Sequence, residues 1–166
     1  MKNLKLLAAF IAVFFITAES YSQMPPEPIK SPMIDAMLGT WVSEPYEMMG
    51  SKMTDRAVHS LVLNGQYMEI DVSSKADNGF TYEGRIFIYP EKDGSMKGTM
   101  FDVFGGSGTN YTGTVDGNKV TMTGTNEMMS ETREIIMDDD KMTHNVTFDI
   151  KGMPQQKVTI VYNKEK

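Results

Sequence analysis

Two histidines are the residues of this chain best suited to hold a metal or a haem iron, because a neutral imidazole nitrogen is a common ligand. His144 alternates with apolar residues in a strand-like segment, which places it alone on an apolar face. The pattern around His59 does not indicate a face, and no carboxylate is spaced to complete a two-histidine metal site. We therefore expect His144 to be a buried histidine of the interior, and we expect no metal site and no cofactor.

Arg56 is one of three arginines, and it lies in a segment that is also strand-like. Pointing inward, it could bind a ligand carboxylate through two parallel hydrogen bonds, as cationic residues do in fatty-acid carriers. Pointing outward, it would form a surface ion pair with Asp55, Glu69 or Glu131, which is the commoner arrangement for a strand arginine.

The 16 methionines allow two interpretations. Thioether sulfurs could bind a soft metal such as Cu(I), or they could line an interior that adapts to irregular apolar ligands. We favour the adaptable interior, because copper-binding methionine motifs usually repeat at short regular spacing with histidines among them.

Other polar motifs predict turns rather than sites. Asp138-Asp139-Asp140 lacks the alternate spacing and the distal glutamate of a calcium loop. Gly105-Gly106-Ser107-Gly108 has the composition of a phosphate-binding loop but precedes a strand, so we expect a flexible hairpin at a barrel mouth. No serine, histidine and acid can be grouped as a triad, and we assign no catalytic residue.

The elements that must position these residues are short strands. From Gly39 to Tyr162, alternating segments are closed by glycine, asparagine or aspartate turns about every ten residues, with Asn64-Gly65 and Asp116-Gly117-Asn118 as the strongest hairpin signals. This predicts an all-β domain over residues 31–166, a single up-and-down antiparallel β-barrel of about ten strands that encloses a lumen.

One short helix is predicted ahead of the first strand. Ser31 would be its N-cap and Pro32 its first residue, and Gly39 would end it. Met33, Ile34, Met37 and Leu38 would then form a buried stripe, so we expect this helix to close one end of the barrel.

Alternation within the strands indicates which side chains face the lumen. We expect the ligand-binding residues to be Arg56, Met68, Ile70, Met100, Met122, His144, Val146, Phe148 and Ile160.

Residues 1–22 have the order of a signal peptide. Lys2 and Lys5 precede an apolar run from Leu6 to Ile16, which is shorter than the ~20 residues that a membrane span needs. We expect cleavage after Ser22, with Ser20 as the alternative, and a periplasmic or secreted protein. The proline-rich residues 23–30 would be an extended tether.

Composition excludes several classes of partner and site. The chain has no cysteine, which excludes disulfides, a lipidated cysteine anchor and thiolate metal sites. Without residues 1–22, which hold two of the 16 basic and one of the 22 acidic residues, 14 basic and 21 acidic residues remain and the net charge is −7. An acidic surface disfavours nucleic acid and anionic lipid as partners. The partner we expect is a small hydrophobic ligand inside the lumen, and we expect no membrane anchor.

Several short motifs resemble those of an exported bacterial family catalogued as domain of unknown function 1579. The motifs are Leu38-Gly39-Thr40-Trp41, Arg56, Leu63-Asn64-Gly65-Gln66-Tyr67, Phe80-x-Tyr82-Glu83-Gly84, Tyr89, Gly98-Thr99-Met100, and Asp102 before Gly105-Gly106-Ser107-Gly108. The resemblance covers roughly residues 36–164. It implies a calycin-like barrel, related in shape to lipocalins, fatty-acid-binding proteins and nitrobindin. The family has no established activity, so it assigns no catalytic residue.

Nitrobindin binds haem through a histidine in its last strand. Aligning Gly152-Met153-Pro154 with that pattern places Val158 at the ligand position, and valine cannot ligate iron. The resemblance therefore implies weak haem binding or none, unless His144 on the neighbouring strand replaces the missing ligand.

Three functions are compatible with these patterns. The first is an exported barrel that binds a small apolar or amphipathic molecule, and it is the one we favour. The second is a barrel enzyme that acts on a hydrophobic substrate, for which an inward Arg56 or His144 beside a carboxylate would be the first evidence. The third is a structural envelope protein with a filled core.

Overall fold

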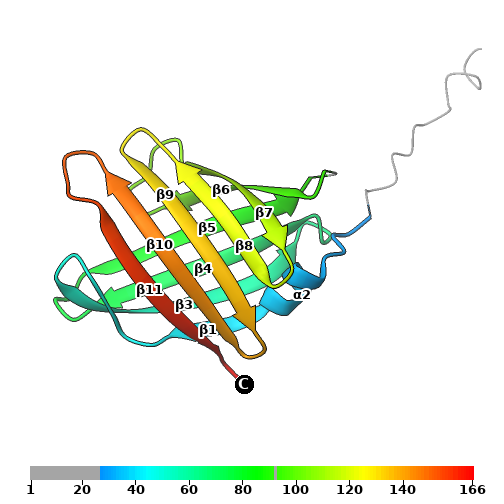
Figure 1. Ribbon diagram of the computed structural model, residues 1–166, viewed down its shortest axis with the longest axis horizontal. Helices are drawn as coiled ribbons and strands as arrows, with labels where there is room; N and C mark the ends of the chain where they lie inside the picture. The colour runs from blue at the N-terminus through cyan, green and yellow to red at the C-terminus, as the bar shows by residue number, and fades with distance from the viewer. Residues whose placement is uncertain (1–26, 92) are drawn as a thin grey trace, which may run out of the picture.

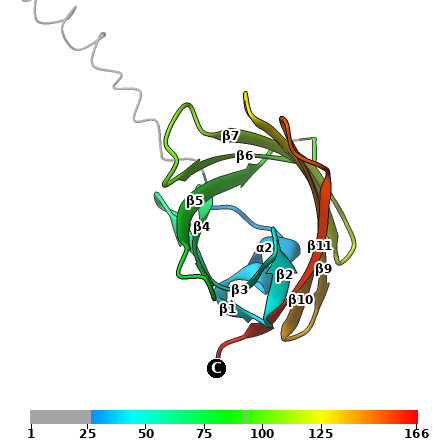
Figure 2. The ribbon, with the colours of Figure 1, turned by 90° about the vertical axis from the view of Figure 1, so that its left-hand side faces the viewer.

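In the computed structural model, which describes residues 27–91 and 93–166, the chain forms a closed antiparallel β-barrel (Figures 1 and 2). The elements are α2 (Pro32–Met37), β1 (Gly39–Ser43), β2 (Tyr46–Met48), β3 (Ser51–Val62), β4 (Tyr67–Ala76), β5 (Thr81–Pro90), β6 (Ser95–Asp102), β7 (Thr109–Asp116), β8 (Lys119–Thr125), β9 (Met129–Asp138), β10 (Lys141–Ile150) and β11 (Gln156–Lys164). The expected signal peptide lies outside the described residues.

The barrel closes through β1. Each strand from β3 to β11 pairs with the next, and β1 pairs with both β11 and β3, which gives ten strands in the closed ring. The short β2 pairs with β3 as an eleventh strand. Within residues 27–91 and 93–166, the predicted all-β, up-and-down barrel of about ten strands with one short helix is confirmed.

Both predicted turns join hairpins, but they differ in length. Asp116 pairs with Lys119, so Gly117-Asn118 is a two-residue turn. Val62 pairs with Tyr67, so Asn64-Gly65 lies inside a longer turn of residues 63–66. Leu63 and Asn64 have φ values of 50° and 60°, and this left-handed backbone is one that asparagine tolerates better than leucine.

Helix α2 closes one end of the barrel (Figure 2). The Ser31 hydroxyl accepts a hydrogen bond from the Ile34 amide at 3.4 Å, as expected of an N-cap. Met33, Ile34 and Met37 are buried against the core. The helix ends at Met37 with Leu38 as its C-cap, and Gly39 follows with a φ of 117°, as expected of a glycine that terminates a helix. Gly39 is also the first residue of β1, where it pairs with His59.

The segment before α2 is held against the barrel. The Ile29 amide donates to the Gly65 carbonyl at 2.8 Å, and the Ile29 side chain packs against the core. Residues 27–30, the described part of the predicted tether, have no regular secondary structure and contact the β3–β4 turn.

The two ends of the lumen differ in filling. The turns β3–β4, β5–β6, β7–β8 and β9–β10 lie at the same end as α2, since consecutive hairpins alternate between ends. The largest fully buried side chains come from α2, β1 and the strand residues nearest this end: Ile34, Met37, Trp41, Met68, Ile88, Met96, Val120 and Met142. This end is therefore a packed core, and the other end is open. In the described part of the chain, no helix is long and apolar enough to span a bilayer.

Candidate functional site

The open half of the lumen is a cavity of about 810 Å³. Apolar side chains form most of its wall, among them Ile70, Ile86, Met100, Met122, Phe148 and Ile160, and Met37 of α2 lies at its floor. Small-molecule sites have volumes of about 300–1,000 Å³ and similarly apolar walls. The size and chemistry of the lumen therefore suit a small organic ligand.

The entrance is also apolar. Four of the turns around it each contribute one large apolar residue that both lines the cavity and is exposed to solvent: Met49 at 50%, Phe80 at 45%, Phe104 at 73% and Met128 at 60%. The glycine-rich segment 105–108 lies at this mouth, where the sequence placed it. An apolar molecule would meet an apolar surface before it entered.

A buried carboxylate lies in the wall. Asp55, on β3, is 5% exposed, and its oxygens accept hydrogen bonds from the hydroxyls of Tyr46 at 2.9 Å and Tyr162 at 2.7 Å. Its amide donates to the Ser43 hydroxyl at 2.7 Å. Burial first, and then the Asp55 charge, raise the pKa values of both tyrosines, so both stay protonated as donors.

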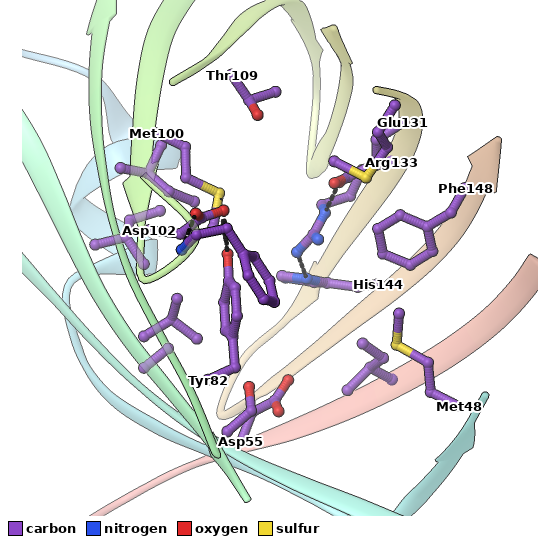
Figure 3. Close-up of a pocket in the computed structure, with 18 of the residues that line it drawn as sticks. Met48, Asp55, Tyr82, Met100, Asp102, Thr109, Glu131, Arg133, His144 and Phe148 are labelled. Atoms are coloured by element: carbon purple, nitrogen blue, oxygen red, sulfur yellow. Dashed lines mark hydrogen bonds and ion pairs between the residues drawn. The ribbon is translucent and has the colours of Figure 1, made fainter. Parts of the chain in front are cut away.

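Arg133 of β9 lines the same cavity and lies between Glu131 and His144 (Figure 3). Nε of Arg133 donates to a carboxylate oxygen of Glu131 at 2.6 Å, and Nη1 lies 3.0 Å from Nδ1 of His144. The second oxygen of Glu131 accepts from the Tyr111 hydroxyl at 3.1 Å. Glu131 is 3% exposed, whereas the Arg133 side chain is 22% exposed. Arg133 is thus fixed on two sides and reachable on a third.

The contact with Arg133 determines the state of His144. A guanidinium only donates, so Nδ1 of His144 must accept, and the ring proton of the neutral form is on Nε2. Burial first, and then the Arg133 charge, lower the pKa of His144 well below its usual value, which keeps the ring neutral. Nε2 has no hydrogen-bond partner among the described residues.

This arrangement is the reverse of a metal-ligating histidine. Such a histidine usually donates its second N–H to a carboxylate or carbonyl, which leaves a lone pair for the metal. In His144 the lone pair is taken by Arg133, so the replacement haem ligand considered above is disfavoured by its own hydrogen bonding. Val158, the aligned haem-ligand position, is partly buried on β11 and offers no ligand atom. Weak haem binding or none stays a prediction.

A third polar group lies on the opposite wall. The Tyr82 hydroxyl donates to Asp102 at 3.3 Å, and the hydroxyls of Tyr82 and Tyr111 lie 3.7 Å and 3.6 Å from the Met100 sulfur. Tyr111 packs over Gly124, its cross-strand partner on β8, where a Cβ would collide with the ring. A glycine at this position therefore leaves room for the tyrosine that holds Glu131.

The charges of the lining are mostly negative. Asp55, Asp102, Glu127 and Glu131 line the cavity, and Arg133 is the one cationic residue among the described residues of the lining. The described residues contain no group of three or more histidine, aspartate or glutamate side chains arranged to hold a metal ion.

The nine predicted site residues fall into three groups: residues that line the cavity, residues buried in the core, and Arg56, which lies outside. Six of the predicted residues line the cavity: Ile70, Met100, Met122, His144, Phe148 and Ile160. Met68 and Val146 are buried in the core without lining it.

The inward placement of Arg56 is wrong. Its side chain is 50% exposed on the outside of β3 and pairs with Glu165 at 3.0 Å. The outward alternative was the better one, but the partner is not Asp55, Glu69 or Glu131. The lumen arginine is Arg133.

Sequence reasoning missed the charged residues of the lumen. The signal for Arg133 and Glu131 was present, because both share a face with Ile135 and Met137 under strand alternation. Asp55 likewise shares a face with Met53 and Ala57. Charged residues in strands are usually exposed, so these three residues were not assigned to the lumen despite the alternation.

Comparisons with known proteins identify a fold and no family. No family model matches the chain, and no curated protein matches it. Among solved structures, it resembles Rv2717c from M. tuberculosis, with a TM-score of 0.66 and 13% identity over 83% of this chain and 100% of that one. The chain has a calycin-like fold.

Two further structures resemble it. The S-type phycobiliprotein lyase CPES from Guillardia theta has a TM-score of 0.62 and 7% identity, over 80% of this chain and 90% of that one. Fatty-acid-binding protein 1 of Echinococcus granulosus has a TM-score of 0.46 and 14% identity, over 80% and 99%. The likeness to Rv2717c and to the lyase concerns the fold alone, and nothing is inferred from the fatty-acid-binding protein. The resemblance to domain of unknown function 1579 stays a prediction.

Proposed function

We propose that this protein is an exported binding barrel, periplasmic or secreted, that takes an apolar or amphipathic small molecule into its lumen. The observation that carries the proposal is the cavity of about 810 Å³ with apolar walls and an apolar entrance. A ligand that covers such walls gains about 25 cal/mol for each Å² removed from water. The signal-like residues 1–22 and the motifs that resemble those of an exported family support export.

Two alternatives have less support. A structural barrel with a filled core does not account for a cavity of this size. A barrel enzyme needs a base or a nucleophile, and the lone pair of His144 is taken by Arg133 while its pKa is lowered. Binding requires only the walls and a few fixed polar groups.

The test compares two neighbouring substitutions on β10. Phe148→Asp places an unpaired charge in the cavity wall, whereas Thr147 lies on the other face of the strand, so Thr147→Asp leaves the lumen unchanged. We expect Nile red, an uncharged apolar dye, to bind the wild type and Thr147→Asp with equal affinity and to lose at least about tenfold in affinity for Phe148→Asp.

Two outcomes would count against the proposal. Equal losses in the two variants would place the dye outside the lumen. No binding by the wild type to Nile red or to a wide panel of lipids and chromophores would favour the structural barrel. Circular dichroism of each variant separates lost binding from lost folding.

Export has its own test. The N-terminal sequence of protein recovered from outside the cytoplasm should begin near Gln23, since cleavage is expected after Ser22. A protein that retains Met1 and sediments with membranes would contradict export in this form.

A further inference from the structure

Arg133 is the reachable hydrogen-bond donor of the cavity wall. Its Nε and Nη1 atoms are engaged by Glu131 and His144, and no contact among the described residues engages Nη2. The Nε2 proton of His144 is also unpartnered, but the atom itself is fully buried. A ligand with a hydrogen-bond acceptor can therefore be bound at Arg133 without disturbing the existing contacts.

Three of the four carboxylates of the wall already accept hydrogen bonds. Both oxygens of Asp55 accept from tyrosine hydroxyls, Glu131 accepts from Arg133 and Tyr111, and Asp102 accepts from Tyr82 and from the Phe104 amide. The fourth, Glu127, is exposed in the turn between β8 and β9, and the unpartnered Nδ1 of His59 is fully buried. Beside Arg133 the wall thus offers a free donor and no free carboxylate oxygen, so it matches an acceptor on the ligand rather than a donor.

The charge around Arg133 decides which kind of acceptor fits. Glu131 lies against the guanidinium at 2.6 Å and compensates its charge, and Asp55 and Asp102 add further negative charge to the same lumen. A carboxylate brought to Arg133 would be repelled by these three groups in a medium of low dielectric constant. A carbonyl, ester or amide oxygen is uncharged, so it can accept a hydrogen bond from Arg133 without being repelled by the carboxylates.

We infer that the ligand of this cavity is an uncharged amphipathic molecule whose oxygen acceptor binds Arg133, and that Glu131 excludes carboxylates such as fatty acids. This inference rests on the proposed function and specifies the ligand class of the same cavity. Arg133 is the binding residue, and Glu131 sets its selectivity.

The experiment uses three probes that differ at one position. Undecan-2-one has the carbonyl acceptor, decanoate has an oxygen anion in place of the ketone methyl, and undecane has a methylene in place of the carbonyl. Each displaces Nile red from the full mature chain, and the dissociation constants give two ratios, decanoate to ketone and ketone to undecane. Because the probes differ in hydration, the inference depends on how the ratios change between variants.

Glu131→Gln is the decisive variant. The amide keeps the size and an oxygen for Arg133, and its NH₂ can donate to the Tyr111 oxygen, but the compensating charge is gone. We expect the wild type to bind undecan-2-one more tightly than decanoate, and Glu131→Gln to shift the ratio toward decanoate by about tenfold or more. Glu134→Gln, on the outer face of the same strand beside Lys119, is the matched control and should shift nothing.

The role of Arg133 itself needs a second variant. Arg133→Met alone would leave the Glu131 charge unpaired, so the double variant Glu131→Gln with Arg133→Met is used. It should weaken undecan-2-one relative to undecane by about three- to tenfold. The ratio is used because a less polar wall also changes the affinity for undecane itself.

The outcomes are separable. A wild type that prefers decanoate, or a ratio that Glu131→Gln leaves unchanged, overturns the inference while the binding barrel stands. If the double variant has the same ketone-to-undecane ratio as the wild type, Arg133 is not the donor that binds the carbonyl. If neither Nile red nor any probe binds the wild type, the proposed function fails first.

Discussion

Asp55 is a buried carboxylate that no lysine or arginine of the described residues pairs with, and tyrosine hydroxyls take the place of a cation. Hydrogen bonds to an ionised acceptor contribute about 1.5–3 kcal/mol each. In Asp55→Asn one acceptor oxygen becomes an NH₂ donor, which opposes the tyrosine hydroxyls. We expect the free energy of unfolding to fall by about 2 kcal/mol in urea titrations.

Asp149→Asn is the matched control for this prediction. Asp149 is exposed on the outer face of β10, so its substitution should change the free energy of unfolding by less than about 0.5 kcal/mol. Equal effects at the two positions would mean that the tyrosine contacts of Asp55 contribute nothing.

The lowered pKa values of the two buried histidines predict that the protein loses stability in mild acid. Burial first, and then the Lys164 charge, lower the pKa of His59 to about 4, although hydrogen bonding to the Met37 backbone opposes this in part. An unfolded histidine titrates near pH 6.5, so below that pH the unfolded chain binds protons that the folded chain does not. The stability that depends on a neutral His59 is therefore fully present above about pH 6.5 and is lost as the pH falls toward 4.

For His59 alone, this linkage lowers the free energy of unfolding by about 1 kcal/mol between pH 7 and pH 5.5. Urea unfolding at the two pH values measures the effect, to which His144 adds in the same direction. His59→Leu should reduce the difference between the two pH values. A difference that this variant leaves intact would assign the pH dependence to other groups.

At the scale of single residues, the uncharged side chains that face inward were predictable from alternation, and the charged side chains that face inward were not. His144 and Phe148 line the cavity as alternation indicates. Arg56 and Arg133 both lie in alternating strands, and only the neighbours on the same face distinguish them. Arg133 is tolerated inside because Glu131 and His144 satisfy it, and such partners come from register between strands, which one strand's pattern does not contain.

Among the elements, α2 supplies much of the packing at the closed end of the barrel, so weakening its contacts should lower the stability of that end. Ile34 is 1% exposed in the core, and the Met37 carbonyl accepts from the Trp41 indole at 2.7 Å. Ile34→Ala should therefore lower the free energy of unfolding by about 2–4 kcal/mol, as measured in urea.

Asp35→Ala provides the comparison on the same helix. Asp35 is exposed in the first turn and contributes only its charge, so its loss should be smaller than about 1 kcal/mol. A cost for Ile34→Ala that is no larger than this would mean that α2 lies loosely over the barrel end.

The elements themselves were largely readable from the sequence, because hairpin turns and alternation are local. The helix start at Ser31 and Pro32 follows from capping chemistry within a few residues. The start of the barrel is less regular, because residues 39–48 form two strands, β1 and β2. The chain leaves the ring near Pro45 and Tyr46 to add an edge strand, and that departure depends on pairing with β3 rather than on local pattern.

At the scale of the whole molecule, the lumen could be predicted but its free volume could not. Barrel closure by ten strands leaves an interior that side chains fill only in part. Which part stays empty depends on where the largest residues gather. Here Trp41 and several methionines fill the end that α2 covers, so the free space lies beside the open turns.

Ligand binding in this cavity should stabilise the entire barrel, because every strand from β3 to β11 contributes to the wall. A ligand that binds only the folded chain adds about 2.7 kcal/mol to the free energy of unfolding at 100 times its dissociation constant. Nile red at that concentration should therefore raise the thermal midpoint by several degrees, with an effect that grows with the logarithm of dye concentration. Thr147→Asp should show the same shift and Phe148→Asp a smaller one at the same dye concentration. A shift of equal size in both variants would mean that the dye stabilises the protein from a surface site, and the cavity would then have no part in binding it.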